Sequence, residues 1–311
     1  MKVLGLLLLL AATSAAAQSG VIRIVVPFAA GGVQDIIARS INAELGAALG
    51  RSVIVENRPG AGGTVGTGSV AKGAPEGTMV LAAASHTIAG SLYAKLAYDP
   101  IADFTGVAHV GNVDYVLMVN SSIPAGDVKA FIAHLKSNPG KYNYATAGNG
   151  SATHLSMAYF CGLAGVEMVH IPLKATGEAV NEVLAGRSHA VIAANIGALP
   201  YLKDARIRML GATGPKRSKF LPELPAIAES LPGYEFDSWI ALLAPAATPR
   251  AFVDQVNAAM AGLLKDPVIL ARLDKQGVVP QAMAPEALNA LLRADFQRMA
   301  RVVKASGARI D

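Results

Sequence analysis

Two stretches of the sequence share one pattern: a short apolar run, a glycine-containing turn, then apolar residues at helical spacing. Residues 21–26 precede the turn at 27–32, and residues 142–145 precede the turn at 146–150. Each stretch predicts a strand, a loop and an amphipathic helix in that order. The sequence therefore contains two similar strand–loop–helix units, far apart along the chain.

Strand-like and helix-like patterns alternate through most of the remaining sequence. This alternation predicts an α/β protein with mainly parallel sheets. The first helix is expected to begin near Val33 and to stop at Gly50. Further strands are predicted at residues 52–56, 79–84, 107–119, 166–171, 190–194, 207–212 and 239–244. Further helices are predicted at residues 67–72, 128–136, from Ser151 onward, 178–185, 250–264, 267–275 and 285–306, the last ending at Gly307.

Two breaks in this alternation indicate how the chain is divided. They fall near Asn120 and near Ser238, and they predict a middle domain inserted into an outer one. We expect one lobe at residues 18–120 plus 243–311 and the other at 121–242. Two connecting strands would then form the hinge.

The N-terminus has the pattern of an export signal. Lys2 is followed by an apolar stretch at 3–12 and by small residues at 15–17, before Gln18. The stretch is shorter than the roughly 20 residues of a membrane-spanning helix. No cysteine lies near the cleavage point, so a lipid anchor there is not expected. We therefore expect residues 1–17 to be a signal peptide and the mature chain to be exported.

Composition narrows the functional classes. The chain is 52% hydrophobic but only 5% aromatic, which suits a large α/β core. Its formal charge is +5, but the basic residues are scattered and lack the interleaved aromatics of a nucleic-acid-binding surface. The single cysteine, Cys161, cannot form an internal disulfide and is expected to be a buried, inert thiol.

The sequence does not match the motifs of common enzyme classes. Residues 66–71 fit a dinucleotide-binding glycine pattern, but the nearest acidic residue, Glu76, follows far too soon. No nucleophile elbow or phosphate-binding loop occurs, and the six histidines lack metal-ligand spacing. We expect no catalytic residues, no metal and no cofactor.

The two glycine-containing turns are the strongest candidates for a binding site. Each precedes a helix N-terminus, where unpaired N–H groups and about half a positive charge favour an anion. In the first turn, Gly31 and Gly32 are expected to offer amides, and Phe28 an apolar wall. Asp35 has two interpretations, since it can contact a ligand through water or an amine, or pair with Arg39 four residues on. We favour the pairing.

The second turn offers a similar set of groups. Gly148 and Gly150 supply amides, and Ser151 and Thr153 supply amides and hydroxyls. Ser151 can also cap the following helix, and both roles are compatible. His154 falls one turn into that helix, where packing or capping is expected.

Strand ends add weaker candidates, because α/β clefts place ligands at that edge. Ser85 and His86 follow one predicted strand and Asn195 follows another, while Lys174 is a candidate for a second carboxylate. Trp239, the only tryptophan, is expected to pack in the core near the hinge. The full set of expected ligand-binding residues is Phe28, Ala30, Gly31, Gly32, Asp35, Ser85, His86, Gly148, Gly150, Ser151, Thr153, Lys174 and Asn195.

Several of these segments together resemble a known family. The sequence is similar to the Bug-type periplasmic receptors, the solute-binding proteins of tripartite tricarboxylate transporters. The likeness covers nearly the whole mature chain, in order and at family-like spacing. It is carried by residues 27–39 (PFAAGGVQDIIAR), 55–63 (VENRPGAGG), 98–100 (YDP), 148–155 (GNGSATHL), 216–218 (KRS), 231–234 (LPGY) and 303–307 (VKASG).

The resemblance implies a fold, a ligand class and a partner. The fold would be the type II periplasmic-binding-protein fold, with two α/β lobes joined by a two-strand hinge. The ligand would be a small aliphatic, aromatic or amino-acid carboxylate bound between the two loops, and the partner the membrane subunits of the transporter. We expect a periplasmic monomer. The chain departs from the family at Ala29-Ala30, where prolines are common, and at 173–175, where Leu-Lys-Ala replaces Tyr-Lys-Gly; the second change affects the pocket wall.

Two other functions stay open at this point. The same fold could serve a periplasmic signalling partner, which loss of uptake on deletion and neighbouring transporter genes would argue against. An exported enzyme would need turnover that is lost when one side chain is replaced, and the sequence nominates no such side chain.

Overall fold

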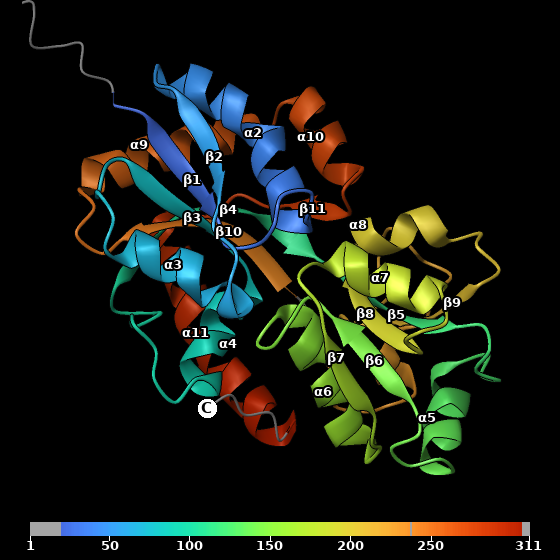
Figure 1. The fold of residues 1–311 in the computed structure, drawn as a ribbon. Coiled ribbons are helices and arrows are strands. Elements are labelled where there is room, and N and C mark those ends of the chain that lie inside the picture. The colour runs from blue at the N-terminus through green and yellow to red at the C-terminus, as the bar shows by residue number, and fades with distance from the viewer. Residues whose placement is uncertain (1–19, 237, 307–311) are drawn as a thin grey trace, which may run out of the picture.

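The computed structural model describes residues 20–236 and 238–306. These residues form two α/β lobes, each built on one mixed sheet with helices packed against it (Figure 1). The first and last parts of the chain build one lobe, and the middle part, green to yellow in Figure 1, builds the other. The expected signal peptide and the expected helix end at Gly307 lie outside the described residues.

The first sheet combines strands from both ends of the chain. Its strands in spatial order are β11 (Val278–Pro280), β4 (Phe104–Val113), β10 (Ser238–Pro245), β3 (Thr78–Ala82), β1 (Ile22–Val26) and β2 (Val53–Asn57). β1 pairs parallel to β2 and β3, whereas β10 runs antiparallel to β3 and β4. β1 has fully buried Ile and Val side chains, as expected of a strand with a helix on each face.

The second sheet is formed by the middle of the chain. Its spatial order is β7 (Val169–Pro172), β6 (Asn143–Thr146), β8 (Ala190–Ala194), β5 (Tyr115–Asn120) and β9 (Ile207–Ala212). β6 is parallel to β7 and β8, but β5 is antiparallel to both its neighbours. The prediction of mainly parallel sheets is therefore wrong: the strands that connect the lobes enter each sheet from the opposite direction.

The helices form where capping and apolar spacing agree. α2 buries Ile37, Ile41 and Leu45 and ends at Gly50, whose φ of 62° suits glycine. The helices of the first lobe are α2 (Val33–Leu49), α3 (Thr64–Ala71), α4 (Ala84–Leu92), α9 (Arg250–Leu263), α10 (Pro267–Asp274) and α11 (Pro285–Ser306). Those of the second lobe are α5 (Val128–Lys136), α6 (Ala152–Ala164), α7 (Thr176–Leu184) and α8 (Asn195–Ala198).

The chain crosses between the sheets twice. It passes from β4 to β5 at Asp114 and returns to β10 after Phe236. The sequence-based boundaries, 120/121 and 242/243, lie a few residues beyond these points, at the end of β5 and inside β10. We propose that the lobes divide at the crossings, since β5 stays paired in the second sheet and β10 in the first.

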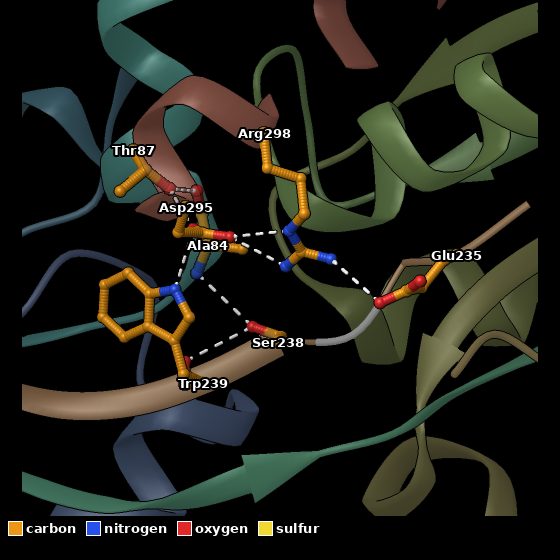
Figure 2. Close-up of polar contacts among 7 residues, drawn as sticks. All are labelled: Ala84, Thr87, Glu235, Ser238, Trp239, Asp295 and Arg298. Carbon is orange, nitrogen blue, oxygen red and sulfur yellow. Dashed lines mark hydrogen bonds and ion pairs between the residues drawn. The ribbon is translucent and has the colours of Figure 1, made fainter. Parts of the chain in front are cut away.

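A buried polar cluster lies beside the return crossing (Figure 2). Asp295 of α11, whose side chain is 2% exposed, accepts hydrogen bonds from Trp239 Nε1 at 2.8 Å and Thr87 Oγ1 at 2.6 Å. Arg298 pairs with the same carboxylate at 2.7 Å and lies 4.0 Å from Glu235 in the returning segment. The expectation that Trp239 packs in the core near the hinge is confirmed.

Helix α11 contacts both lobes. It packs against α4 in the first lobe and α6 in the second. A Cβ at Gly162 of α6 would lie only 2.5 Å from the carbonyl oxygen of Ala305. The C-terminal helix therefore contacts both lobes on the side of the molecule where the chain returns from the second lobe.

Candidate functional site

The two glycine-containing loops face one cavity between the lobes. It has a volume of about 30 Å³, room for about two water molecules. From the first lobe it is lined by the loop after β1. From the second lobe it is lined by the loop after β6, the start of β5, the end of β8 and the start of α7. The lining residues are Phe28, Ala29, Gly32, Val33, Gln34, Tyr115, Ala147, Ser151, Ala152, Thr153, Ala175, Thr176 and Ala194.

Three helices begin at this cavity. Val33 is the first residue of α2, Ala152 of α6 and Thr176 of α7, and all three line the cavity. The first amides of a helix have no carbonyl partner within the helix. Because three such ends converge, partial positive charge and unpaired N–H groups concentrate at one point.

In the first loop, the glycine amides are engaged internally. The Gly31 amide donates to Asp35 Oδ2 at 2.9 Å, and the Gly32 amide donates to the Ala29 carbonyl at 3.2 Å. The expected donors are thus occupied, and the amides that remain at the cavity belong to Val33 and Gln34.

Asp35 is buried and takes the structural role. Its Oδ1 accepts from Arg39 Nε at 3.0 Å, the i,i+4 pair expected from the sequence. Burial acts to raise the pKa of Asp35, but hydrogen bonds from Arg39, Gly31 and Asn57 outweigh it and lower that pKa. The carboxylate therefore stays ionised, fixing the loop rather than facing the cavity.

In the second loop, hydroxyl groups organise the backbone. Ser151 Oγ accepts from the His154 amide at 3.2 Å and donates to the Gly148 carbonyl at 2.7 Å, so Ser151 does cap α6. Thr153 Oγ1 accepts from the Ala147 amide at 2.8 Å. These bonds hold the loop so that the Ala152 and Thr153 amides lie at the cavity.

Two histidines contact the loop after β6 and stabilise it. His154 Nδ1 accepts from the Gly150 amide at 3.3 Å, and its ring stacks on His170 with centroids 4.1 Å apart. His170 Nε2 lies 2.6 Å from Thr146 Oγ1, which accepts from the Gly148 amide at 3.1 Å. Burial lowers the pKa of both histidines to about 4, so both rings are neutral near pH 7. The packing role expected for His154 is what the structure shows.

A larger pocket adjoins the inner cavity. It has a volume of about 570 Å³ and shares Phe28, Ala29 and Ala147 with the cavity. Its other residues include Gly148 and Lys174. Among the residues lining either space in the described part of the chain, Lys174 is the one with a charged side chain.

Other expected site residues lie elsewhere. Ser85 and His86 are not in a loop but in the first turn of α4, and His86 Nε2 contacts the Pro100 carbonyl at 2.7 Å within the first lobe. Asn195 follows the lining residue Ala194 and donates to Ser218 Oγ at 3.3 Å. Ala30 is exposed and does not line the cavity.

The residues that line the cavity but were not among the sequence-based candidates are Ala29, Val33, Gln34, Tyr115, Ala147, Ala152, Ala175, Thr176 and Ala194. Four of these residues, Val33, Gln34, Ala152 and Thr176, lie at helix starts, where they contribute backbone amides. The signal for Thr176 was present, because a helix follows the strand at 169–172 just as α2 follows β1. Carboxyl ends of neighbouring parallel strands meet at one edge, so that helix start belongs to the same site.

No group of three or more His, Cys, Asp or Glu residues is arranged to bind a metal within residues 20–236 and 238–306. In the same residues, no helix has the length and apolar content needed to span a bilayer. The residues that line the inner cavity contribute neutral amides, hydroxyls and apolar groups.

Fold and site together define a solute-binding receptor of the periplasmic-binding-protein class. The family model described as "Tripartite tricarboxylate transporter family receptor" matches residues 37–308, so the chain belongs to that family of non-catalytic receptors. The periplasmic binding protein BugD is 31% identical, with a TM-score of 0.85 over 93% of this chain and 98% of its own.

Two related structures contain ligands. Rpa4515 of R. palustris, solved with adipate, is 32% identical, with a TM-score of 0.87 over 93% of this chain and 98% of its own. MatC (Rpa3494) of Rhodopseudomonas palustris, solved with bound malate, is 31% identical, with a TM-score of 0.84 over 91% and 98%. The type II fold expected from the sequence is confirmed by these likenesses.

Proposed function

We propose that this receptor binds a small organic carboxylate in the inner cavity through the amides at the starts of α2, α6 and α7. The observation that carries the proposal is the convergence of these three helix ends on one cavity. Adipate and malate, seen with related receptors, are the first candidates. Each hydrogen bond to a charged group is worth about 1.5–3 kcal/mol, so three or four would support roughly micromolar binding, about −8 kcal/mol.

Binding requires the lobes to part and close again. The inner cavity of about 30 Å³ is far smaller than the roughly 300 Å³ of an ordinary ligand pocket. Rotation about the two crossings would open it toward the larger pocket, and ligand binding would then stabilise the closed form. Phe28, which lines both spaces, would cover the carbon skeleton of the ligand.

The wider role follows from the family. The receptor would be exported by the signal at residues 1–17, act as a monomer in the periplasm, and deliver its ligand to the membrane subunits of a tripartite transporter. Two observations support this: the N-terminal sequence pattern and membership of the receptor family.

Proline at a first helical position tests the proposal. Val33→Pro and Ala152→Pro each delete one cavity amide, and proline is tolerated there because the preceding Gly32 and Ser151 have extended ψ values of 168° and 159°. We expect each to weaken adipate or malate binding about tenfold by calorimetry, as loss of one charge-assisted bond implies. Arg250→Pro, at the start of α9, is the control, since Pro249 has a ψ of 135°.

The affinities of the three proline variants distinguish an amide site from its absence. Weaker binding in both cavity variants, with the control unchanged and all three melting near the wild-type temperature, supports the amide site. Unchanged affinity in both cavity variants would reject it.

A further inference from the structure

Besides the packing of α11 against α6, the lobes meet at another place outside the inner cavity. The loop after β2, which includes the 3₁₀ turn Ala61–Gly63, lies against the Asn149–Gly150 segment of the other lobe. Both segments belong to the rim of the larger pocket. None of these residues lines the inner cavity, so their contact does not involve the proposed ligand-binding amides.

Tyr93 connects the two segments. Its side chain follows α4 in the first lobe, and its hydroxyl donates to the Ala61 carbonyl at 2.8 Å. The same hydroxyl lies 3.5 Å from the Asn149 carbonyl of the second lobe. Burial raises the pKa of the Tyr93 hydroxyl, so it remains a donor at neutral pH.

Two glycines allow this approach. A Cβ at Gly62 would lie 2.4 Å from the Asn149 carbonyl oxygen and 3.1 Å from the Gly150 carbonyl carbon. A Cβ at Gly150 would lie 2.9 Å from the Tyr93 hydroxyl oxygen. Real Cβ atoms do not come as close as 2.4 Å to a backbone oxygen, so a side chain at Gly62 would push the lobes apart. At Gly150 the added atom would meet the end of the Tyr93 side chain, which would have to shift.

We propose that Gly62, Tyr93 and Gly150 form a latch that positions the two lobes in the closed arrangement. This inference rests on the proposed function, because closure matters only if a ligand is captured. The contact of Tyr93 with Asn149 and the close approach of Gly62 to residues 149–150 join the lobes without touching the inner cavity, so they raise the closed population whatever carboxylate is bound. Apparent affinity is proportional to the closed fraction, and weakening the latch therefore weakens binding.

Gly50 provides a matched control for Gly62. Both residues have a φ of 62°, so alanine meets the same backbone strain at each. No atom lies within 4 Å of a Cβ at Gly50, which ends α2 away from the latch. An effect found in Gly62→Ala but not in Gly50→Ala comes from the surroundings of Gly62, which also lines the larger pocket, and a larger radius of gyration assigns that effect to the contact between the lobes.

The experiment measures affinity and shape together. We expect Gly62→Ala to bind adipate or malate at least tenfold more weakly than Gly50→Ala, and to have a larger radius of gyration by small-angle X-ray scattering. Tyr93→Phe removes only the hydroxyl and is expected to weaken binding about two- to tenfold. If Gly62→Ala does not fold, the affinity and the radius of gyration of Tyr93→Phe test the latch.

Equal affinity and equal scattering in Gly62→Ala and Gly50→Ala would overturn the latch, as would an unchanged Tyr93→Phe. Absence of carboxylate binding by the wild-type receptor would instead reject the proposed function. In that case the scattering comparison alone still tests the latch.

Discussion

The indole Nε1 of Trp239 donates a hydrogen bond to Oδ2 of Asp295 at 2.8 Å (Figure 2). Trp239 lies at the start of β10, directly after the chain returns from the second lobe, and Asp295 lies on α11. The carboxylate also accepts from Thr87 and pairs with Arg298. This buried group thus anchors one of the two crossings to the body of the first lobe.

Replacing Asp295 by asparagine tests that anchor. The substitution removes the charge that pairs with Arg298, whose side chain is 26% exposed, and disturbs two further bonds. We expect the free energy of unfolding to fall by about 2–4 kcal/mol in chemical denaturation. Trp239→Phe removes one bond of the same group and is expected to cost about 1 kcal/mol. An Asp295→Asn variant as stable as the wild type would show that the cluster contributes nothing to the fold.

The stacked histidines make stability depend on pH. Burial, with a further contribution from the adjacent His170, lowers the pKa of His154 to about 4, whereas an unfolded histidine titrates near about 6.5. Between these values the unfolded chain binds more protons, so the free energy of unfolding falls as pH drops from about 6.5 toward 4. We expect His154 to contribute about 2 kcal/mol of this loss between pH 7 and pH 5.

Denaturation of His154→Gln at the two pH values checks this. Glutamine keeps an acceptor for the Gly150 amide but does not titrate, so the difference between pH 7 and pH 5 should shrink. Part of the difference will remain, because burial also lowers the pKa of His170 and of His86 to about 4. His134→Gln on α5, outside this stack, is the control and should leave the difference intact. An identical difference in all three proteins would exclude His154 as a source of the pH dependence.

Lys174 should distinguish ligands with one acidic group from those with two. It contributes the cationic side chain of the larger pocket, beyond the inner cavity. We expect Lys174→Gln to weaken dicarboxylate binding about threefold to fivefold at low salt, with little effect on monocarboxylates. Calorimetry with matched acids of each type measures this. Lys216→Gln, an exposed site elsewhere, is the control; equal losses for mono- and dicarboxylates would assign Lys174 no selective role.

Much of the fold could be predicted from local sequence patterns. The apolar runs at 190–194 and 207–212 are β8 and β9, and the amphipathic run at 285–306 is α11, residue for residue. These elements carry their own period and boundaries. The direction of a strand cannot be predicted in this way. β5 and β10 run antiparallel to their neighbours because of how the chain crosses between the lobes.

For the proposed binding site, the sequence predicts the position in the fold but not the atomic detail. The helix starts at Val33 and Ser151 were correctly placed, and they do face one cavity. The sequence could not show that the Asp35 carboxylate turns back to occupy the Gly31 amide, since that contact depends on the three-dimensional turn. Ser85 and His86 lie in the first turn of α4, which has no side-chain cap, and they line neither space, so their role in binding stays a prediction.

The most direct test of the account follows the backbone amides during ligand binding. In ¹⁵N-labelled receptor titrated with adipate or malate, we expect the amide signals of Val33, Ala152 and Thr176 to move most, as new donors to a carboxylate. The Gly31 amide, already bonded to Asp35, should move less. Saturable shifts confined to another surface, with these three helix-start amides unmoved, would contradict the central claim.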